Sequence, residues 1–98
     1  MSTYVVELTV LSDTVNSPVV HFPGRRFPGV LVQGDSLENM ASLAAGIAKQ
    51  IGLGDLEKAK WATQDLAEQL DCHVKLYEET LKAFGLELPY PSQAKKDG

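Results

Sequence analysis

The sequence is poor in the residues that build disulfides, metal centres and nucleic-acid surfaces. Cys72 is the only cysteine among 98 residues, which excludes an internal disulfide and a cysteine-rich metal site. Nine lysine and arginine residues against 13 aspartate and glutamate residues give a net charge of −4. This balance disfavours nucleic-acid binding, which needs a concentrated basic surface. No apolar run approaches the ~20 residues that cross a bilayer. We predict neither nucleic acid nor membrane as a partner.

The amino terminus also lacks the pattern of a secretory signal. Met1-Ser2-Thr3 leads directly into Tyr4-Val5-Val6, with no basic region and no cleavage site. Together with the single cysteine, this predicts a soluble, cytoplasmic protein. The composition, 44% apolar and 22% charged, is that of an ordinary globular domain. We predict one α+β domain over residues 1–88 and an extended or disordered tail over residues 89–98.

Three short stretches with strand character come first in the chain. Residues 4–11 alternate and are rich in valine and threonine, which favour the pleated backbone. Residues 19–22 and 30–33 are the second and third predicted strands. The connections between them are too short for a parallel crossover, so the predicted sheet is a three-stranded antiparallel meander.

A local duplication lies between the second and third predicted strands. Pro23-Gly24 and Pro28-Gly29 each suit the central positions of a type II turn, because proline fixes φ and glycine accepts a positive φ. Two such turns form a tight corner with Arg25 and Arg26 at its tip. These arginines are candidates for gripping a carboxylate or phosphate on a partner, and a solvent-exposed turn is the alternative.

Two helices follow the predicted strands. The first starts at Asp35 or Ser36, where Asp35 and Glu38 have capping-box spacing, and it ends at Gly52. Its apolar residues recur at helical spacing and predict a single stripe along the helix. The stripe consists of Leu37, Met40, Ala41, Ala44, Ile47, Ala48 and Ile51.

The second helix is predicted from Leu56 to Phe84, with Gly54-Asp55 before it and Gly85 ending it. At ~1.5 Å per residue it is roughly 40 Å long, which exceeds the height of the predicted sheet. Part of it must therefore pack on the first helix, on the tail or on another chain. We predict that both helices pack on one face of the sheet. A second apolar arc, formed by Trp61, Cys72 and Leu76, is either a contact face or scattered surface residues.

The residue types that carry catalysis do not form a recognisable set. His21 is best explained as a half-buried strand histidine. Cys72 and His73 are neighbours on a helix and point ~100° apart, so they cannot share one metal ion. Gly29 and Gly34 lie at the two ends of a strand with no lysine after them, unlike a phosphate-binding loop. We predict a protein that is not an enzyme and holds no cofactor and no metal.

Residues 19–49 resemble the amino-terminal domain of HicB-like antitoxins. The similarity lies in the order of a strand ending in Phe22-Pro23, the Pro28-Gly29 turn, an apolar strand, and residues 33–38 opening an alanine-rich helix. The resemblance implies a ribonuclease-H-like sheet without catalysis that binds and blocks a small toxin. The whole chain also resembles a small, uncharacterised bacterial family that shares the run from Pro23 to Ser36.

These observations predict a non-catalytic interaction domain of the antitoxin or immunity type, which occludes a cognate toxin-like or effector-like protein. The predicted partner-binding residues are Arg25, Arg26, Trp61, Cys72 and Leu76. One alternative is a homodimeric structural module that pairs through the long helix. Another is a small-molecule-binding domain with a pocket between sheet and helices.

Overall fold

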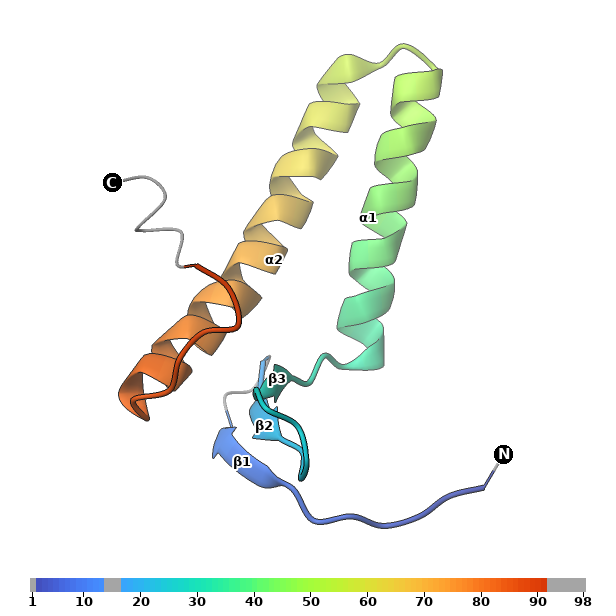
Figure 1. The fold of residues 1–98 in the computed structure, drawn as a ribbon. Helices are drawn as coiled ribbons and strands as arrows, with labels where there is room; N and C mark the ends of the chain where they lie inside the picture. Colours follow the sequence, from blue (N-terminus) through green and yellow to red (C-terminus); the bar gives the residue numbers. More distant parts are fainter. Residues whose placement is uncertain (1, 14–16, 92–98) are drawn as a thin grey trace. The chain divides into compact units, whose positions relative to one another are not determined.

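The computed structural model describes residues 2–13 and 17–91. Its elements are β1 (Thr9–Ser12), β2 (Val19–His21), β3 (Gly29–Val30), α1 (Gly34–Gly52) and α2 (Leu56–Ala83) (Figure 1). The chain divides into two compact units, which we call the sheet unit (residues 1–31 and 76–98) and the hairpin unit (residues 32–75). The single domain over residues 1–88 stays a prediction.

The predicted fold class is confirmed: a three-stranded antiparallel sheet in the order β1-β2-β3 precedes two helices, the second of them long. The register pairs Thr9 with His21 and Val10 with Val20, and a β-bulge follows before Ser12. The first strand is shorter than the predicted range of residues 4–11. Because the chain turns directly after β2, residues 4–8 find no partner strand there and are not part of the sheet.

The third strand also differs from the prediction, because β3 starts at Gly29 and ends before Leu31. Gly29 pairs with Val20 in the ladder, and its φ is not positive. The predicted type II turn at Pro28-Gly29 is therefore wrong. The sheet needs an extended backbone at Gly29, and this requirement overrides the local preference of the Pro-Gly pair. Beyond the strand, the amide of Leu31 donates to the carbonyl of Pro18 at 2.9 Å.

The core of the sheet unit joins β2 to the end of α2. Val19, Tyr77 and Leu81 are buried together. Leu11, Val30 and Leu88 pack around them. The buried Tyr77 hydroxyl donates to the carbonyl of Pro28 at 2.7 Å. The last turns of α2 are thus fixed to the sheet by apolar burial and by one buried hydrogen bond, which satisfies the carbonyl beside β3.

The start of α1 does not use the predicted cap. The helix begins at Gly34 after an extended Gln33 that makes no side-chain capping bond. The carboxylate of Asp35 instead accepts from the amide of Ser36 at 2.8 Å, and that of Glu38 accepts from the Ser42 hydroxyl at 2.6 Å. The prediction of a capping box is therefore wrong. Asp35 still places a negative charge in the first turn, where the helix dipole favours it.

The turn between the helices agrees better with the sequence-based prediction than the start of α1 does. Gly54 has a φ of 77°, and the amide of Asp55 donates to the carbonyl of Gln50 at 2.9 Å. Helix α1 ends at Gly52 as predicted, and left-handed Gly54 with its backward bond lies two residues beyond that end. Helix α2 begins at Leu56 as predicted, and the carboxylate of Asp55 caps it by accepting from the amide of Lys58 at 3.1 Å. Gly85, with a φ of 68°, ends α2 as predicted.

Replacing Tyr77 by phenylalanine tests the link between α2 and the sheet. The change keeps the ring and leaves the Pro28 carbonyl without its donor, so we expect a loss of about 1–3 kcal/mol in the free energy of unfolding. Urea denaturation followed by circular dichroism measures it. The exposed Tyr4 gives a matched control, for which Tyr4→Phe should leave the midpoint unchanged. Equal midpoints for Tyr77→Phe and the unmodified chain would show that the bond contributes nothing.

Candidate functional site: an arginine corner and an open helical face

The first predicted turn forms as expected and positions the two arginines. The amide of Arg25 donates to the carbonyl of Phe22 at 3.3 Å, and Gly24 has a φ of 82°. A positive φ at the third position, after Pro23, is the geometry of a type II turn. Arg25 and Arg26 lie exposed just beyond it. We call Phe22–Phe27 the arginine corner.

His21, the last residue of β2, is hydrogen-bonded to the arginine corner. Its Nε2 lies 2.7 Å from the carbonyl oxygen of Arg25. Since a carbonyl oxygen can only accept, Nε2 carries the proton in this bond. The ring is half-buried on β2, which confirms the predicted strand histidine. Its polar contact is structural, because it ties the end of the strand to the turn.

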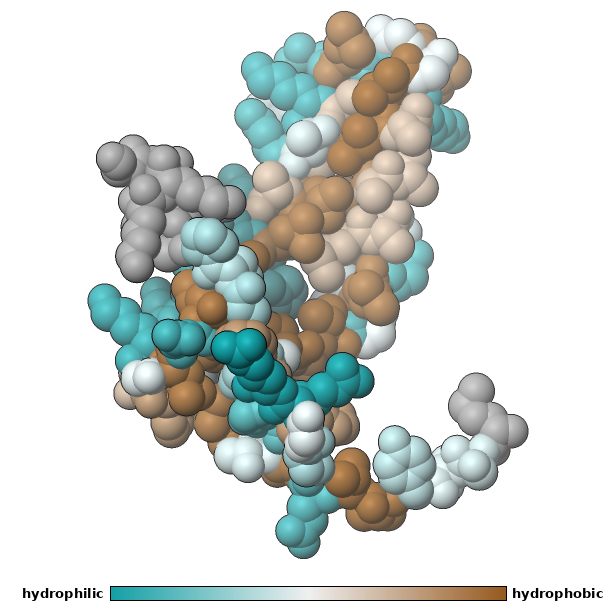
Figure 2. Space-filling view, viewed as in Figure 1, coloured by the Kyte–Doolittle hydropathy of each residue, from teal (hydrophilic) through white to brown (hydrophobic). Residues whose placement is uncertain are grey.

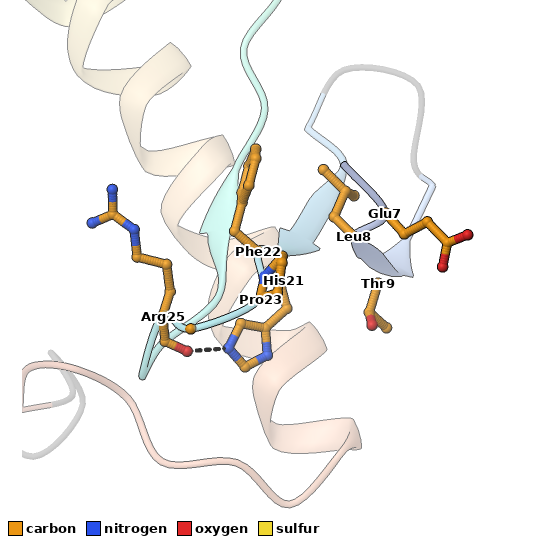
Figure 3. A pocket seen from close by; sticks show the side chains of 8 residues that line it. Glu7, Leu8, Thr9, His21, Phe22, Pro23 and Arg25 are labelled. Carbon is orange, nitrogen blue, oxygen red and sulfur yellow. Dashed lines mark hydrogen bonds between the residues drawn. The ribbon is translucent and has the colours of Figure 1, made fainter. Parts of the chain in front are cut away.

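The two arginines differ in their surroundings. The guanidinium of Arg26 stacks over the Phe27 ring, 5.0 Å from the ring centroid, which is a cation–π contact. Figure 3 shows the Arg25 side chain directed away from His21, with Glu7 on the opposite side of the hollow. The described residues provide no carboxylate within ion-pair distance of either arginine. Both charges are thus available to an outside anion.

Three shallow hollows of the sheet unit surround the arginine corner. One of about 220 Å³ lies between the β1 side and the turn, and includes Glu7, His21 and Arg25 (Figure 3). A second, of about 370 Å³, has an aromatic lining of Tyr4, Phe22 and Phe27 beside Arg25. The third, of about 320 Å³, extends from Arg26 and Phe27 to residues 85–87. Small-molecule sites enclose most of their ligand. Open hollows lined by aromatic and arginine side chains are therefore better suited to contact with a protein than to enclosing a small molecule.

The predicted arc on α2 is divided between the two units. Trp61 is 65% exposed and Cys72 is also exposed, both in the hairpin unit. Leu76 is half-buried and belongs to the sheet unit. The arc and the arginine corner therefore remain separate candidate surfaces, and the partner-binding role of all five residues stays a prediction.

The hairpin unit carries an exposed apolar face that the prediction of a single stripe on α1 does not include. Within the predicted stripe, Met40 is buried and Ile47 is half-buried, whereas Leu37, Ala44 and Ile51 are exposed. The stripe contains two neighbouring rows, of which only one faces α2. The signal was present in the sequence, because each row repeats separately with alternating steps of three and four residues.

A small polar cluster lies at the carboxyl end of α2. Burial raises the pKa of Tyr90 to about 12, with a further contribution from its hydrogen bond to the Glu78 carboxylate. Burial also raises the pKa of Tyr77. The second oxygen of Glu78, Oε2, is buried without a hydrogen-bond partner. Within the predicted tail, Tyr90 thus contacts the last turns of α2, whereas residues 92–98 lie outside the described part of the chain.

Two kinds of feature are absent from the described residues. Among residues 2–13 and 17–91, no group of three or more histidine, cysteine, aspartate or glutamate side chains could hold a metal ion. No helix in that part of the chain is long and apolar enough to span a membrane.

Comparison with known proteins identifies the family. Residues 3–90 match a family of unknown function, DUF6959. The chain belongs to this family. No curated protein and no solved structure matches it. The match to DUF6959 provides no link to HicB-like antitoxins, so that resemblance stays a prediction for this DUF6959 member.

The Tyr90 cluster predicts a stability loss at alkaline pH. Because the folded state raises the pKa of Tyr90 from 10 to about 12, its stabilising effect is complete below pH 10 and disappears as the pH rises toward 12. The free energy of unfolding should fall across this window, and Tyr90→Phe should make the fall shallower. Urea denaturation at several pH values measures both slopes. Parallel curves for the two proteins would exclude Tyr90 as the responsible group.

Proposed function

We propose that this chain is a non-catalytic interaction domain of the antitoxin or immunity type, which binds a cognate protein and occludes its working surface. The observation that carries the proposal is the arginine corner: two exposed arginines stand beside open aromatic hollows on a rigid turn. Arginine and aromatic side chains are over-represented among residues that dominate protein interfaces.

The rigidity of the arginine corner supports binding. The turn bond from Arg25 to Phe22, the fixed φ of Pro23 and the His21 contact hold the corner in one shape. A surface that is already ordered loses less conformational entropy when a partner docks. The corner is therefore suited to a protein surface of defined shape.

The charges of the corner indicate the chemistry of the partner. A guanidinium matches a carboxylate with two parallel hydrogen bonds, and Arg26 can do so while its flat face stays on Phe27. The partner we propose therefore carries aspartate or glutamate at the centre of its contact, next to an apolar group that enters the hollow of Tyr4, Phe22 and Phe27. Exposed Trp61, on the hairpin unit, is a second candidate anchor.

Capture from the native host at endogenous expression level tests this function. The tagged full chain should retain a stoichiometric protein. The double variant Arg25→Ala/Arg26→Ala should bind that protein at least tenfold more weakly, which corresponds to a loss of about 1.4 kcal/mol in binding free energy. Arg25→Lys/Arg26→Lys should recover part of the affinity at most, because lysine keeps the charge but not the planar fork.

The matched control removes two positive charges elsewhere. Lys49→Ala/Lys82→Ala changes the net charge equally at exposed positions outside the corner, and it should bind the same protein with unchanged affinity. Absence of a stoichiometric partner, or equal losses in the arginine and lysine variants, would refute the proposed role of the corner.

A further inference from the structure

The hairpin unit buries little of its own apolar surface. Of residues 32–75, all of which are described, only Met40 and Ala59 are buried. Short helices gain most of their stability by packing an apolar face, because an isolated helix is marginal in water. The hairpin therefore has much to gain from a surface that covers it.

The more protected residues form one row on each helix. On α1 this row is Ser36, Met40, Leu43, Ile47 and Gln50, with half-buried Gly46 next to it. On α2 it is Ala59, Ala62, Leu66, Gln69 and His73, preceded by the capping Asp55. Steps of alternately three and four residues keep each row on one side of its helix. The side-chain amide of Asn39 donates to Gln69 Oε1 at 3.3 Å and links the two antiparallel helices. These rows form the contact within the hairpin.

A second row lies one residue further along each helix, which rotates it by about 100°. Because the helices are antiparallel, this rotation brings both second rows to the same side of the hairpin. We call this side the open face. It consists of Leu37, Ala41, Ala44, Ala48 and Ile51 from α1 and Leu56, Lys60, Thr63, Ala67, Leu70 and Val74 from α2, all of them exposed. Figure 2 shows apolar atoms gathered along this side, with hydrophilic atoms at its margins.

We propose that the open face is covered by the open face of a second copy, giving a four-helix dimer. The order of side-chain sizes supports this occupant. Ala41, Ala44 and Ala67 form a small centre, with Leu37 and Leu70 toward one end and Ile51 and Leu56 at the other. Crossing helices are closest at the crossing point and separate toward their ends. A small centre flanked by large ends is therefore complementary to itself.

Charge and area are also compatible with a second copy. Of the eleven positions of the open face only Lys60 is charged, so two copies of this chain can bury the other ten without facing like charges. The long apolar stem of Lys60 allows its ammonium group to reach solvent at the margin of the face. Helix α1 has 19 residues. At ~1.5 Å per residue and a width of ~20 Å for two helices, the face has a flat area of roughly 550 Å². Two such faces together cover roughly 1,100 Å², which is above the ~1,000 Å² expected of a specific interface.

Sedimentation equilibrium of the full chain tests the dimer. The expected mass at about 10 μM is twice the 10.6 kDa of the chain, in the range where a low-micromolar dimer is largely assembled. Ala44→Glu places a carboxylate on the open face and should weaken the dimer at least about tenfold. Ala45→Glu, one residue further and directed away from α2, is the matched control and should leave the dissociation constant unchanged.

A second pair of variants tests the face on the other helix. Thr63→Glu should weaken the dimer, whereas the adjacent, exposed Gln64→Glu should not. Circular dichroism separates a dissociated chain from an unfolded one. A monomeric unmodified chain, a dimer insensitive to both face variants, or equal losses in variants and controls would overturn the proposal. A monomer would instead point to the chain's own sheet unit or a different protein as the cover. The arginine corner is not involved, so this outcome is independent of the capture experiment.

Discussion

A two-helix hairpin can protect only one side of each helix, and this constraint governs the surface of the molecule. The protected row from Ser36 to Gln50 meets its counterpart on α2, yet among residues 32–75 only Met40 and Ala59 become buried. A second apolar row is left one residue further along each helix. In the sheet unit, by contrast, the apolar side of the helix is covered: Tyr77 and Leu81, near the end of α2, are buried against Val19 of the central strand. Helix α2 thus buries apolar side chains near its carboxyl end and exposes a row of them in the part that belongs to the hairpin unit.

Several parts of the fold that depend on local chemistry could be predicted from the sequence, although the capping box of Asp35 and Glu38, which is equally local, does not form. Gly54, Asp55 and Gly85 act at the helix ends because a left-handed glycine or a capping carboxylate needs only its neighbours. The turn at Pro23-Gly24 forms for the same reason. The parts that depend on distant partners could not be predicted. Gly29 is extended because Val20 pairs with it, and residues 4–8 stay outside the sheet because β2 is short.

For the candidate surfaces too, features set by local sequence could be predicted and features set by distant residues could not. Exposure of Arg25 and Arg26 followed from the turn, but the hollows beside them depend on residues distant in sequence: Tyr4 lines one hollow with Phe27, and residues 85–87 line another with it. The predicted arc combined Trp61 and Cys72 with Leu76, which belongs to the sheet unit. On α1 the apolar residues were counted as one stripe, because periodicity alone does not show which of two adjacent rows meets the partner helix.

These features describe a DUF6959 member that exposes a positive corner and a largely apolar helical face. The most direct measurement of that account is the urea midpoint of the unmodified chain at protein concentrations a hundredfold apart, since association stabilises a protein by mass action. A midpoint that rises with protein concentration is the predicted result, because the open face is covered only in the associated state. A midpoint that does not change with concentration, at all concentrations up to the solubility limit, would contradict it.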